Sequence, residues 1–436
     1  MPRTPVKPIP LLCASSVLAA LVLAPCPPTA YAETVESPAR VSLSEALERL
    51  EAQTPDVLAA RLQIAQAEAE RAAAQQYQNP TLSVDVGNLP IGRTNPSGLS
   101  VGQTLTTATR IDQPLVLWGK RRLRIEAAEA GVAAARSDLQ ETLRQLRSAV
   151  KDVFFQAAHD ERLLSFVEGN QRRYDDTVSL SQRRFKSGDL AEAELRKIEL
   201  EQLKYFSDTE EARQALAHSR QLLGRLTGSP VPLAPDSPLA VSDVELPDGD
   251  IVDVALQNRP DLAALQKARD QADLALNLAR RERLPDISVG VDYTHSQFLV
   301  SGDLRNQIGV GFSVPVPLWN QNQAAIAQAE VALRQAETDL AKARLDITQQ
   351  ARDALVQYQS TQRLRHIYEN GYLERAQVTL GAAEVAYRSG GASLIELLEA
   401  ERTYTATQTA YLDALLSARM SLTALEHAIG KDLVAQ

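Results

Sequence analysis

The sequence predicts a mainly α-helical protein with a smaller β portion, built as an internally duplicated chain of long coiled-coil helices and two β-hairpins. Only 5% of its 436 residues are aromatic, while Ala, Leu, Gln, Glu and Arg are abundant, and such a composition favours long helices. Four short segments alternate apolar and polar side chains with the period of two that indicates β-strands. A unit of about two hundred residues is also written twice, which predicts two structural repeats.

Residues 1–32 are predicted to be an export signal peptide. Arg3 and Lys7 precede an apolar run over 11–23, and a small-x-small cleavage pattern ends at Ala32. Removing this segment takes away two basic residues and no acidic residue, so the formal net charge changes from −9 to −11. This acidity argues against a nucleic-acid partner.

The cysteines Cys13 and Cys26 both lie in the predicted signal peptide, so the mature chain is expected to lack thiol and disulfide chemistry. A competing interpretation makes Cys26 a lipidated N-terminus, although Pro25 stands where a lipid-attachment sequence has a small residue. No later run of eighteen or more residues is apolar throughout, so no transmembrane helix is predicted after the signal. The mature protein is therefore expected to be soluble or to cross a membrane through β-strands.

The first predicted repeat covers residues 33–228 and the second covers 251–436, with a proline-rich linker at 229–250 between them. The copies align through these pairs: Pro55 with Pro260, Asp56 with Asp261, Pro80 with Pro285, Trp118 with Trp319, and Gly228 with Gly430. The two tryptophans are the only ones in the chain. The repeat therefore places this scarce residue twice at one structural position.

The first copy is expected to begin with a helix over 42–78, which ends before Pro80. A strand follows at 81–87, and its partner lies at about 104–113. The loop between them is rich in Gly, Asn, Ser and Pro, as expected for the turn of a hairpin.

A very long helix is predicted over 119–185, which contains no proline and has apolar residues at heptad spacing. This spacing is typical of coiled-coil packing. At ~1.5 Å per residue, the helix would be about 100 Å long. Gly188 suits the turn that ends it, and a shorter helix is expected to run back over 190–226.

The second copy repeats this plan, with strands predicted at 287–293 and 308–314 and a loop over 296–303. A second very long helix is expected after Trp319. The first and last helices of each copy are about half as long as the central one. They are therefore expected to stack end to end beside it.

Four strands are too few for a closed membrane barrel, which needs at least about eight. Either the strands form a small open sheet on a soluble protein, or several chains combine their strands. The export signal and the alternating faces favour the second interpretation. Trp118 and Trp319, placed where a strand leads into a helix, suit a membrane–water interface, although they could also fill the junction. Pro114 and Pro315 are expected where strand pairing ends, because a missing N–H costs least there.

Several features together resemble the TolC-type outer membrane efflux family. They are the duplicated helix–hairpin–long helix–tip–helix unit, the tip sequences RFKSG (184–188) and AYRSG (386–390), and the junction sequence PLVLWGKRR (114–122). The likeness covers nearly all of the predicted mature chain. The junction sequence especially resembles the branch that serves heavy-metal RND efflux systems of the cobalt–zinc–cadmium type.

The resemblance implies a homotrimer in the outer membrane of a Gram-negative bacterium, with a twelve-stranded barrel in the lipid and an α-helical tunnel in the periplasm. It implies passive conduction of divalent heavy-metal cations to the exterior. A periplasmic adaptor (membrane fusion protein) and an inner-membrane RND-type pump are the implied partners. A multidrug or type I secretion channel of the same fold is one alternative. A periplasmic coiled-coil adaptor or scaffold is another, from a different class of protein.

An acidic pair follows the second tip. Glu396 and Glu399 lie three residues apart, on one face of the predicted helix. The resemblance implies that such a pair rings the constricted tunnel mouth, and that Tyr387 occupies a position that latches the closed mouth. The first copy has Glu194 and Lys197 at the matching places. The acidic pair therefore belongs to the second copy alone.

A plainer interpretation of the acidic pair also exists. Ser393 and Glu396 have the spacing of a capping box, in which the glutamate serves the helix start. Glu399 could be a solvated residue that pairs with Arg402. The resemblance also implies a basic latch residue where this chain has Ala392.

The helix tips are the surfaces where the resemblance places the adaptor. The residues concerned are Phe185, Ser187, Gly188 and Leu190 in the first copy and Ser389, Gly390 and Gly391 in the second. The plainer interpretation is that these are tight turns between helices, for which Gly188 and Gly390 suffice.

Nothing in the sequence indicates an enzyme or a cofactor. The histidines, at 159, 218, 295, 366 and 427, include no pair at metal-ligand spacing, and Met420 is the only methionine after the signal. A Ser–His–Asp set, a phosphate-binding loop and an HExxH motif are all missing. No catalytic residue, metal site or cofactor is therefore expected.

Overall fold

The computed structural model describes residues 38–93, 97–237, 239, 243–247, 249–299 and 302–434. The predicted signal peptide and the question of Cys26 lie outside these residues. The description below concerns the compact unit that begins at Pro38. Among the described residues, no helix is long and apolar enough to cross a membrane.

The first copy contains the predicted strands and long helices in the predicted order, together with a short helix, α3, that was not predicted. They are α1 (Leu43–Gln53), α2 (Pro55–Gln75), β2 (Thr81–Gly87), α3 (Val101–Thr104), β3 (Thr106–Leu115), α4 (Lys120–Lys186) and α5 (Glu192–Leu226). The single helix expected over 42–78 was wrong, because it is divided at Thr54. This residue is extended, with φ −74° and ψ 129°, as the residue before a proline prefers.

The second copy repeats the order with α6 (Ile251–Asn258), α7 (Pro260–Glu282), β5 (Ile287–Ser296), β6 (Asn306–Ser313), α8 (Gln323–Ile367), α9 (Leu373–Arg388) and α10 (Leu394–Ile429). One expectation fails here, because the second long helix is not continuous. A π-helical turn, η1 (Tyr368–Tyr372), separates α8 from α9, and within it Asn370 has ψ 48° and Gly371 has φ 93°. By contrast, α4 runs unbroken for 67 residues, which is about 100 Å.

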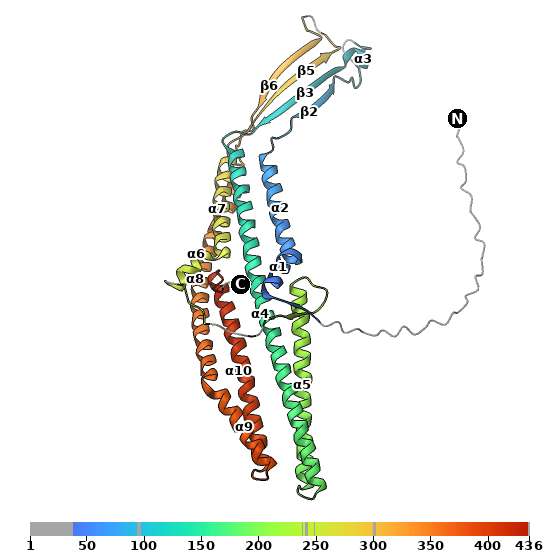
Figure 1. The fold of residues 1–436 in the computed structure, drawn as a ribbon. Coiled ribbons are helices and arrows are strands. Elements are labelled where there is room, and N and C mark those ends of the chain that lie inside the picture. The colour runs from blue at the N-terminus through green and yellow to red at the C-terminus, as the bar shows by residue number, and fades with distance from the viewer. Residues whose placement is uncertain are drawn as a thin grey trace, which may run out of the picture. The chain divides into compact units, whose positions relative to one another are not determined.

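The two predicted hairpins form one antiparallel sheet in the order β2-β3-β5-β6. The central pair joins the two copies, with Arg110 of β3 opposite Asp292 of β5. Figure 1 shows the sheet at one end of the helices and the α4–α5 and α9–α10 turns at the other. A second, small sheet pairs β1 (Ala39–Val41) in parallel with β4 (Leu233–Pro235).

The helices of each copy pack as predicted from their lengths. Both α2 and α5 pack against α4, one beyond the other along its length, and α7 and α10 pack against α8 (Figure 1). α4 also contacts α7 and α10, so it joins the two copies. Apolar residues at the heptad positions of α4, such as Val150, Tyr174 and Val178, are buried. They belong to core clusters that hold the helices together by removing apolar surface from water.

Candidate functional site

Both helix tips are tight turns that depend on a glycine. Gly188 has φ +85° and Gly390 has φ +78°, a left-handed conformation that costs glycine little. Asp189 donates its backbone N–H to the Arg184 carbonyl at 2.8 Å, and Gly391 donates in the same way to Ala386 at 2.8 Å. The plainer interpretation of the tip glycines is therefore confirmed, while docking at the tips stays a prediction.

The tip residues are accessible to a partner. Leu190 is partly covered, and the other predicted docking residues are exposed: Phe185, Ser187, Gly188, Ser389, Gly390 and Gly391. Phe185 is 40% exposed. An aromatic side chain in this position offers apolar area for binding.

The capping box at the start of α10 is present. Ser393 Oγ accepts the backbone N–H of Glu396, and the Ser393 N–H donates to Glu396 Oε2 at 2.7 Å. This backbone hydrogen bond, together with the bond from the Ser393 hydroxyl, holds the pKa of Glu396 below its usual value. Glu396 is therefore a permanently charged carboxylate at neutral pH.

Glu399 is exposed beside Glu396. The expected pairing of Glu399 with Arg402 was wrong, because Arg402 binds Glu201 of α5 at 2.8 Å. Both carboxylates of the predicted acidic pair are thus open to solvent on α10. Glu396 serves the helix start and can still present its charge, so the two interpretations of this residue are compatible.

The side chain of Tyr387, which was predicted to latch the tunnel mouth, is buried in the single chain. Only 3% of it is exposed, and its hydroxyl lies 3.3 Å from Ser181 Oγ of α4. The guanidinium of Arg184 lies 5.3 Å from the centre of its ring, within cation–π range. In the single chain Tyr387 therefore ties α9 to α4, next to both tips.

One buried carboxylate near the tips was missed by sequence reasoning. Glu401 of α10 is 8% exposed, and Tyr205 of α5 donates its hydroxyl to Glu401 Oε2 at 3.2 Å. Burial raises the pKa of Glu401 to about 7. The signal was available, because Glu401 follows Leu394 and Leu397 by seven and four residues and so lies on their buried helix face.

The two tryptophan junctions differ. Trp118 has φ +62° and donates its indole N–H to the Pro285 carbonyl at 2.8 Å. Lys120 Nζ lies 3.0 Å from Asp286 Oδ1, so the first junction is fixed on the chain that leads into β5. Trp319 is 86% exposed. The prediction that both tryptophans lie between a strand and a helix is confirmed.

The prolines lie at the margins of the sheet. Pro114 pairs with Ser288 one position before the last pair of β3 and β5, and Pro315 follows the end of β6 at Ser313. Proline has no backbone N–H to donate, and at these two positions its absence removes no hydrogen bond from the inner part of the sheet. This agrees with the expected end of strand pairing.

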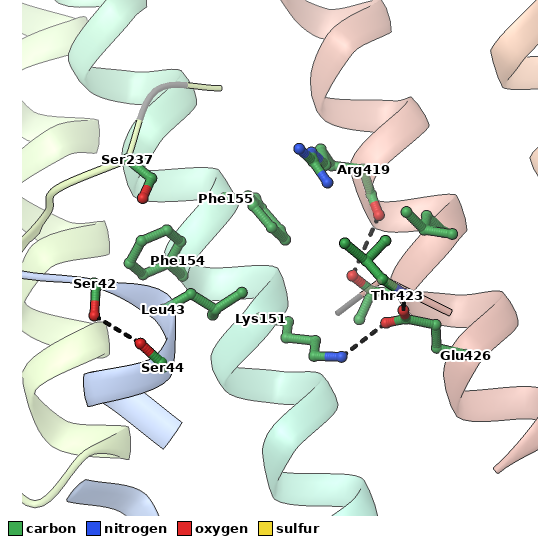
Figure 2. A pocket seen from close by; sticks show the side chains of 12 residues that line it. Ser42, Leu43, Ser44, Lys151, Phe154, Phe155, Ser237, Arg419, Thr423 and Glu426 are labelled. Atoms are coloured by element: carbon green, nitrogen blue, oxygen red, sulfur yellow. Dashed lines mark hydrogen bonds and ion pairs between the residues drawn. The ribbon is translucent and has the colours of Figure 1, made fainter. Parts of the chain in front are cut away.

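A cavity of about 290 Å³ lies midway along α4, between the start of α1 and the last turns of α10 (Figure 2). Phe154 and Phe155 form part of its apolar wall. Lys151 Nζ binds Glu426 Oε2 at 2.7 Å and Asp432 Oδ1 at 2.6 Å. Lys151 and Glu426 are each 8% exposed, so this ion pair joins the two copies inside the protein.

Over the part of the chain that the structure describes, no three His, Cys, Asp or Glu side chains converge as metal ligands would. One histidine, His159, has a carboxylate beside each of its ring nitrogens. His159 lies 3.0 Å from Asp160 and 3.1 Å from Asp413. Both of its ring nitrogens are used in these hydrogen bonds.

Long helical hairpins joined to a small sheet with one apolar face define a channel protomer of the outer membrane. The chain belongs to the outer membrane efflux protein family, since the sequence model of that family matches residues 46–229 and 251–431. It is an outer-membrane efflux channel. The competing interpretation as a periplasmic adaptor or scaffold is therefore wrong.

Individual relatives agree with this assignment. The cobalt-zinc-cadmium resistance protein CzcC of Cupriavidus metallidurans is 22% identical over 333 residues, which cover 75% of this chain and 78% of CzcC. The cation efflux system protein CusC of Escherichia coli O157:H7 is 25% identical over 413 residues, 91% of this chain and 86% of CusC. A crystal structure of CusC shares the fold, with a TM-score of 0.75 at 22% identity over 90% of this chain and 93% of that one.

Proposed function

We propose that the protein is the outer-membrane duct of a tripartite efflux system that exports divalent heavy-metal cations. The observation that carries this proposal is the sheet β2-β3-β5-β6, in which one face exposes apolar side chains, chiefly from β2, β5 and β6, while the other face is polar. Four strands cannot enclose a pore, but three chains together provide twelve. A homotrimer would place the apolar faces against lipid and continue the pore into a helical tunnel.

The residues 33–228 and 251–436 act in this proposal as two repeats joined by the linker 229–250, after removal of the signal peptide 1–32. The matches of the family model, 46–229 and 251–431, fall within these two segments or within one residue of them. The Trp118 and Trp319 junctions would lie near the inner face of the membrane. Indole rings are stable at that level because they combine an apolar ring with an N–H donor.

The far end of the tunnel would be the entrance. Glu396 and Glu399 from three chains would place six carboxylates around the axis, which attracts cations and excludes anions. A periplasmic adaptor would bind the exposed tips around Gly188 and Gly390, and an RND-type pump in the inner membrane would supply the energy. The duct itself would perform no chemistry.

Heavy-metal cargo is supported by the similarity to CzcC, a cobalt-zinc-cadmium resistance protein, and to CusC, a cation efflux system protein. The test uses a Gram-negative strain that lacks this channel but retains its adaptor and pump. Restoring the channel should raise tolerance to cobalt, zinc or cadmium and lower the metal content of the cells. Restored tolerance to dyes or drugs alone, with unchanged metal content, would instead identify a multidrug channel.

A further inference from the structure

The larger sheet carries all the charged side chains of its four strands on one face. They are Asp85 of β2, Arg110 and Asp112 of β3, and Asp292 of β5. The register places Ser83, Arg110, Asp292 and Gly309 in one row across the sheet, and Thr81, Asp112, Gly290 and Gly311 in the adjacent row of the same face. Asp85 belongs to the third row of this face, opposite Ala108.

The other face is mainly apolar on β2, β5 and β6, while β3 contributes Thr107, Thr109 and Gln113 to it. It carries Leu82, Val84, Val86, Ile111, Val289, Val291, Ile308, Val310 and Phe312, and these side chains are exposed in the single chain. Exposed apolar side chains in such number suit lipid rather than water. The charged face is therefore the one that meets an aqueous space.

Arg110 is held by carboxylates from two strands. Its Nε donates to Asp112 Oδ2 at 2.8 Å, and its Nη1 lies 3.5 Å from Asp292 Oδ1. Each of the three side chains is only 28% to 31% exposed. The guanidinium therefore lies along the sheet instead of extending away from it.

Glycines provide the space for this arrangement. A Cβ atom at Gly290 would lie 2.2 Å from Asp112 Oδ1 and 2.6 Å from Arg110 Nη2, and one at Gly309 would lie 2.7 Å from the Asp292 carboxylate. Real atoms do not approach so closely, so any other residue would displace the charged groups. The glycines thus leave room for the side chains of Arg110, Asp112 and Asp292 to lie close against the strands.

We propose that Arg110, Asp112 and Asp292, together with Asp85, form a second charge-selective site of the channel, separate from the acidic pair on α10. The inference rests on the proposed trimeric duct, in which this face lines the pore. Three carboxylates and one guanidinium leave two net negative charges per chain, which favours cations over anions. Arg110 lowers the net negative charge of this face through its ion pairs with Asp112 and Asp292. Cations would therefore bind weakly enough to leave again, as conduction requires.

The test compares purified full-length wild type with Arg110→Gln and Arg110→Lys in planar bilayers, using the reversal potential in a KCl gradient. Removing one positive charge near the ion path should raise the cation-to-anion permeability ratio by roughly twofold to threefold. Arg110→Lys keeps the charge and should stay close to wild type. Asp85→Asn, which alters an exposed carboxylate outside the Arg110 cluster, should lower the ratio.

Each outcome has a distinct meaning. An equal permeability ratio in wild type, Arg110→Gln and Asp85→Asn, all of them conducting, would overturn the charge-selective site and leave the duct intact. An equal shift in Arg110→Gln and Arg110→Lys would show that geometry, and not charge, is responsible, which would also overturn it. A wild-type protein that forms trimers and inserts but does not conduct would overturn the proposed duct itself.

Discussion

The hydroxyl of Tyr205 donates a hydrogen bond to Oε2 of Glu401 at 3.2 Å, and this bond connects the α4–α5 hairpin with the α9–α10 hairpin. Tyr205 also stacks on Tyr174, with ring centres 4.4 Å apart. Glu401 is thus buried next to a pair of stacked tyrosine rings. A titrating group lies where the two halves of the periplasmic end meet.

The stability of the protein should depend on pH through Glu401. Burial raises its pKa from 4.5 to about 7, Glu384 and Glu201 add to the rise, and Tyr205 and Arg173 oppose it. Between about pH 4.5 and pH 7, Glu401 is protonated in the folded protein but ionised in the unfolded chain. The free energy of unfolding contributed by this group should therefore fall as the pH rises from about 4.5 to about 7 and stay level above that.

Glu401→Gln should remove this pH dependence, because glutamine offers Tyr205 an acceptor without a charge. At pH 8 the variant should be more stable than wild type by up to about 3 kcal/mol, and at pH 4.5 the two should be nearly equal. Urea unfolding across this range measures the difference. Glu399→Gln, at an exposed site, is the control. A Glu401→Gln protein with the wild-type pH profile would contradict the prediction.

The buried pair Lys151–Glu426 should be sensitive to the loss of one partner. Lys151→Ala leaves the Glu426 and Asp432 carboxylates without their shared cation, at a cost of about 3–5 kcal/mol for a buried pair. Thermal unfolding should show a large decrease in Tm. Arg196→Ala breaks the exposed pair with Glu192, whose side chains are 73% and 61% exposed, and should cost at most about 1 kcal/mol. A similar decrease in Tm in Lys151→Ala and Arg196→Ala would contradict a structural role for the buried Lys151–Glu426 pair.

The acidic pair should control ion selectivity at the tunnel mouth. Glu396→Gln/Glu399→Gln keeps the capping geometry, since glutamine can occupy this position of a capping box, but removes two charges per chain. The reversal potential in a KCl gradient should shift towards lower cation preference. Glu194→Gln, at the matching place in the first copy, should have little effect. If the double variant behaves as wild type, Glu396 serves only the helix start.

The bend in the second long helix should depend on Gly371. Gly371 and Gly169 each precede the tip glycine of their copy, Gly390 and Gly188, by 19 residues. Gly371→Ala forces a side chain into φ +93° and should destabilise the protein by about 1–2 kcal/mol. Gly169→Ala, within the continuous α4, should be neutral or stabilising by up to about 1 kcal/mol. Urea unfolding compares them, and a stabilising Gly371→Ala would refute the assigned strain.

Sequence reasoning found the features that depend on local pattern. Strands β2, β5 and β6 were visible because their apolar and polar side chains alternate, whereas the threonine-rich β3 shows this alternation only weakly. The helix ends were visible because Gly188 and Gly390 are suited to left-handed turns. The bend at Asn370–Gly371 was missed, although Asn-Gly is a turn dipeptide. The first copy has the reverse order, Gly169–Asn170, and remains helical.

Features that depend on contact between the two copies could not be predicted. The register that brings Arg110 to Asp292, the burial of Glu401 by Tyr205, and the contact of Tyr387 with Ser181 all join residues far apart in the sequence. Pattern indicates which face of a strand or helix is apolar. It does not indicate which distant element covers that face.

The pairing of β1 with β4 affects the order in which the protein can fold. Arg40 donates a hydrogen bond to the Pro235 carbonyl, 195 residues further along the chain, so the first strand closes a loop around the whole first copy. During synthesis or export from the N-terminus, β1 has no partner until β4 emerges. Contacts this distant in sequence slow folding, whereas the α4–α5 coiled coil can form early. The first copy is therefore expected to assemble from its helical tip towards its N-terminal strand.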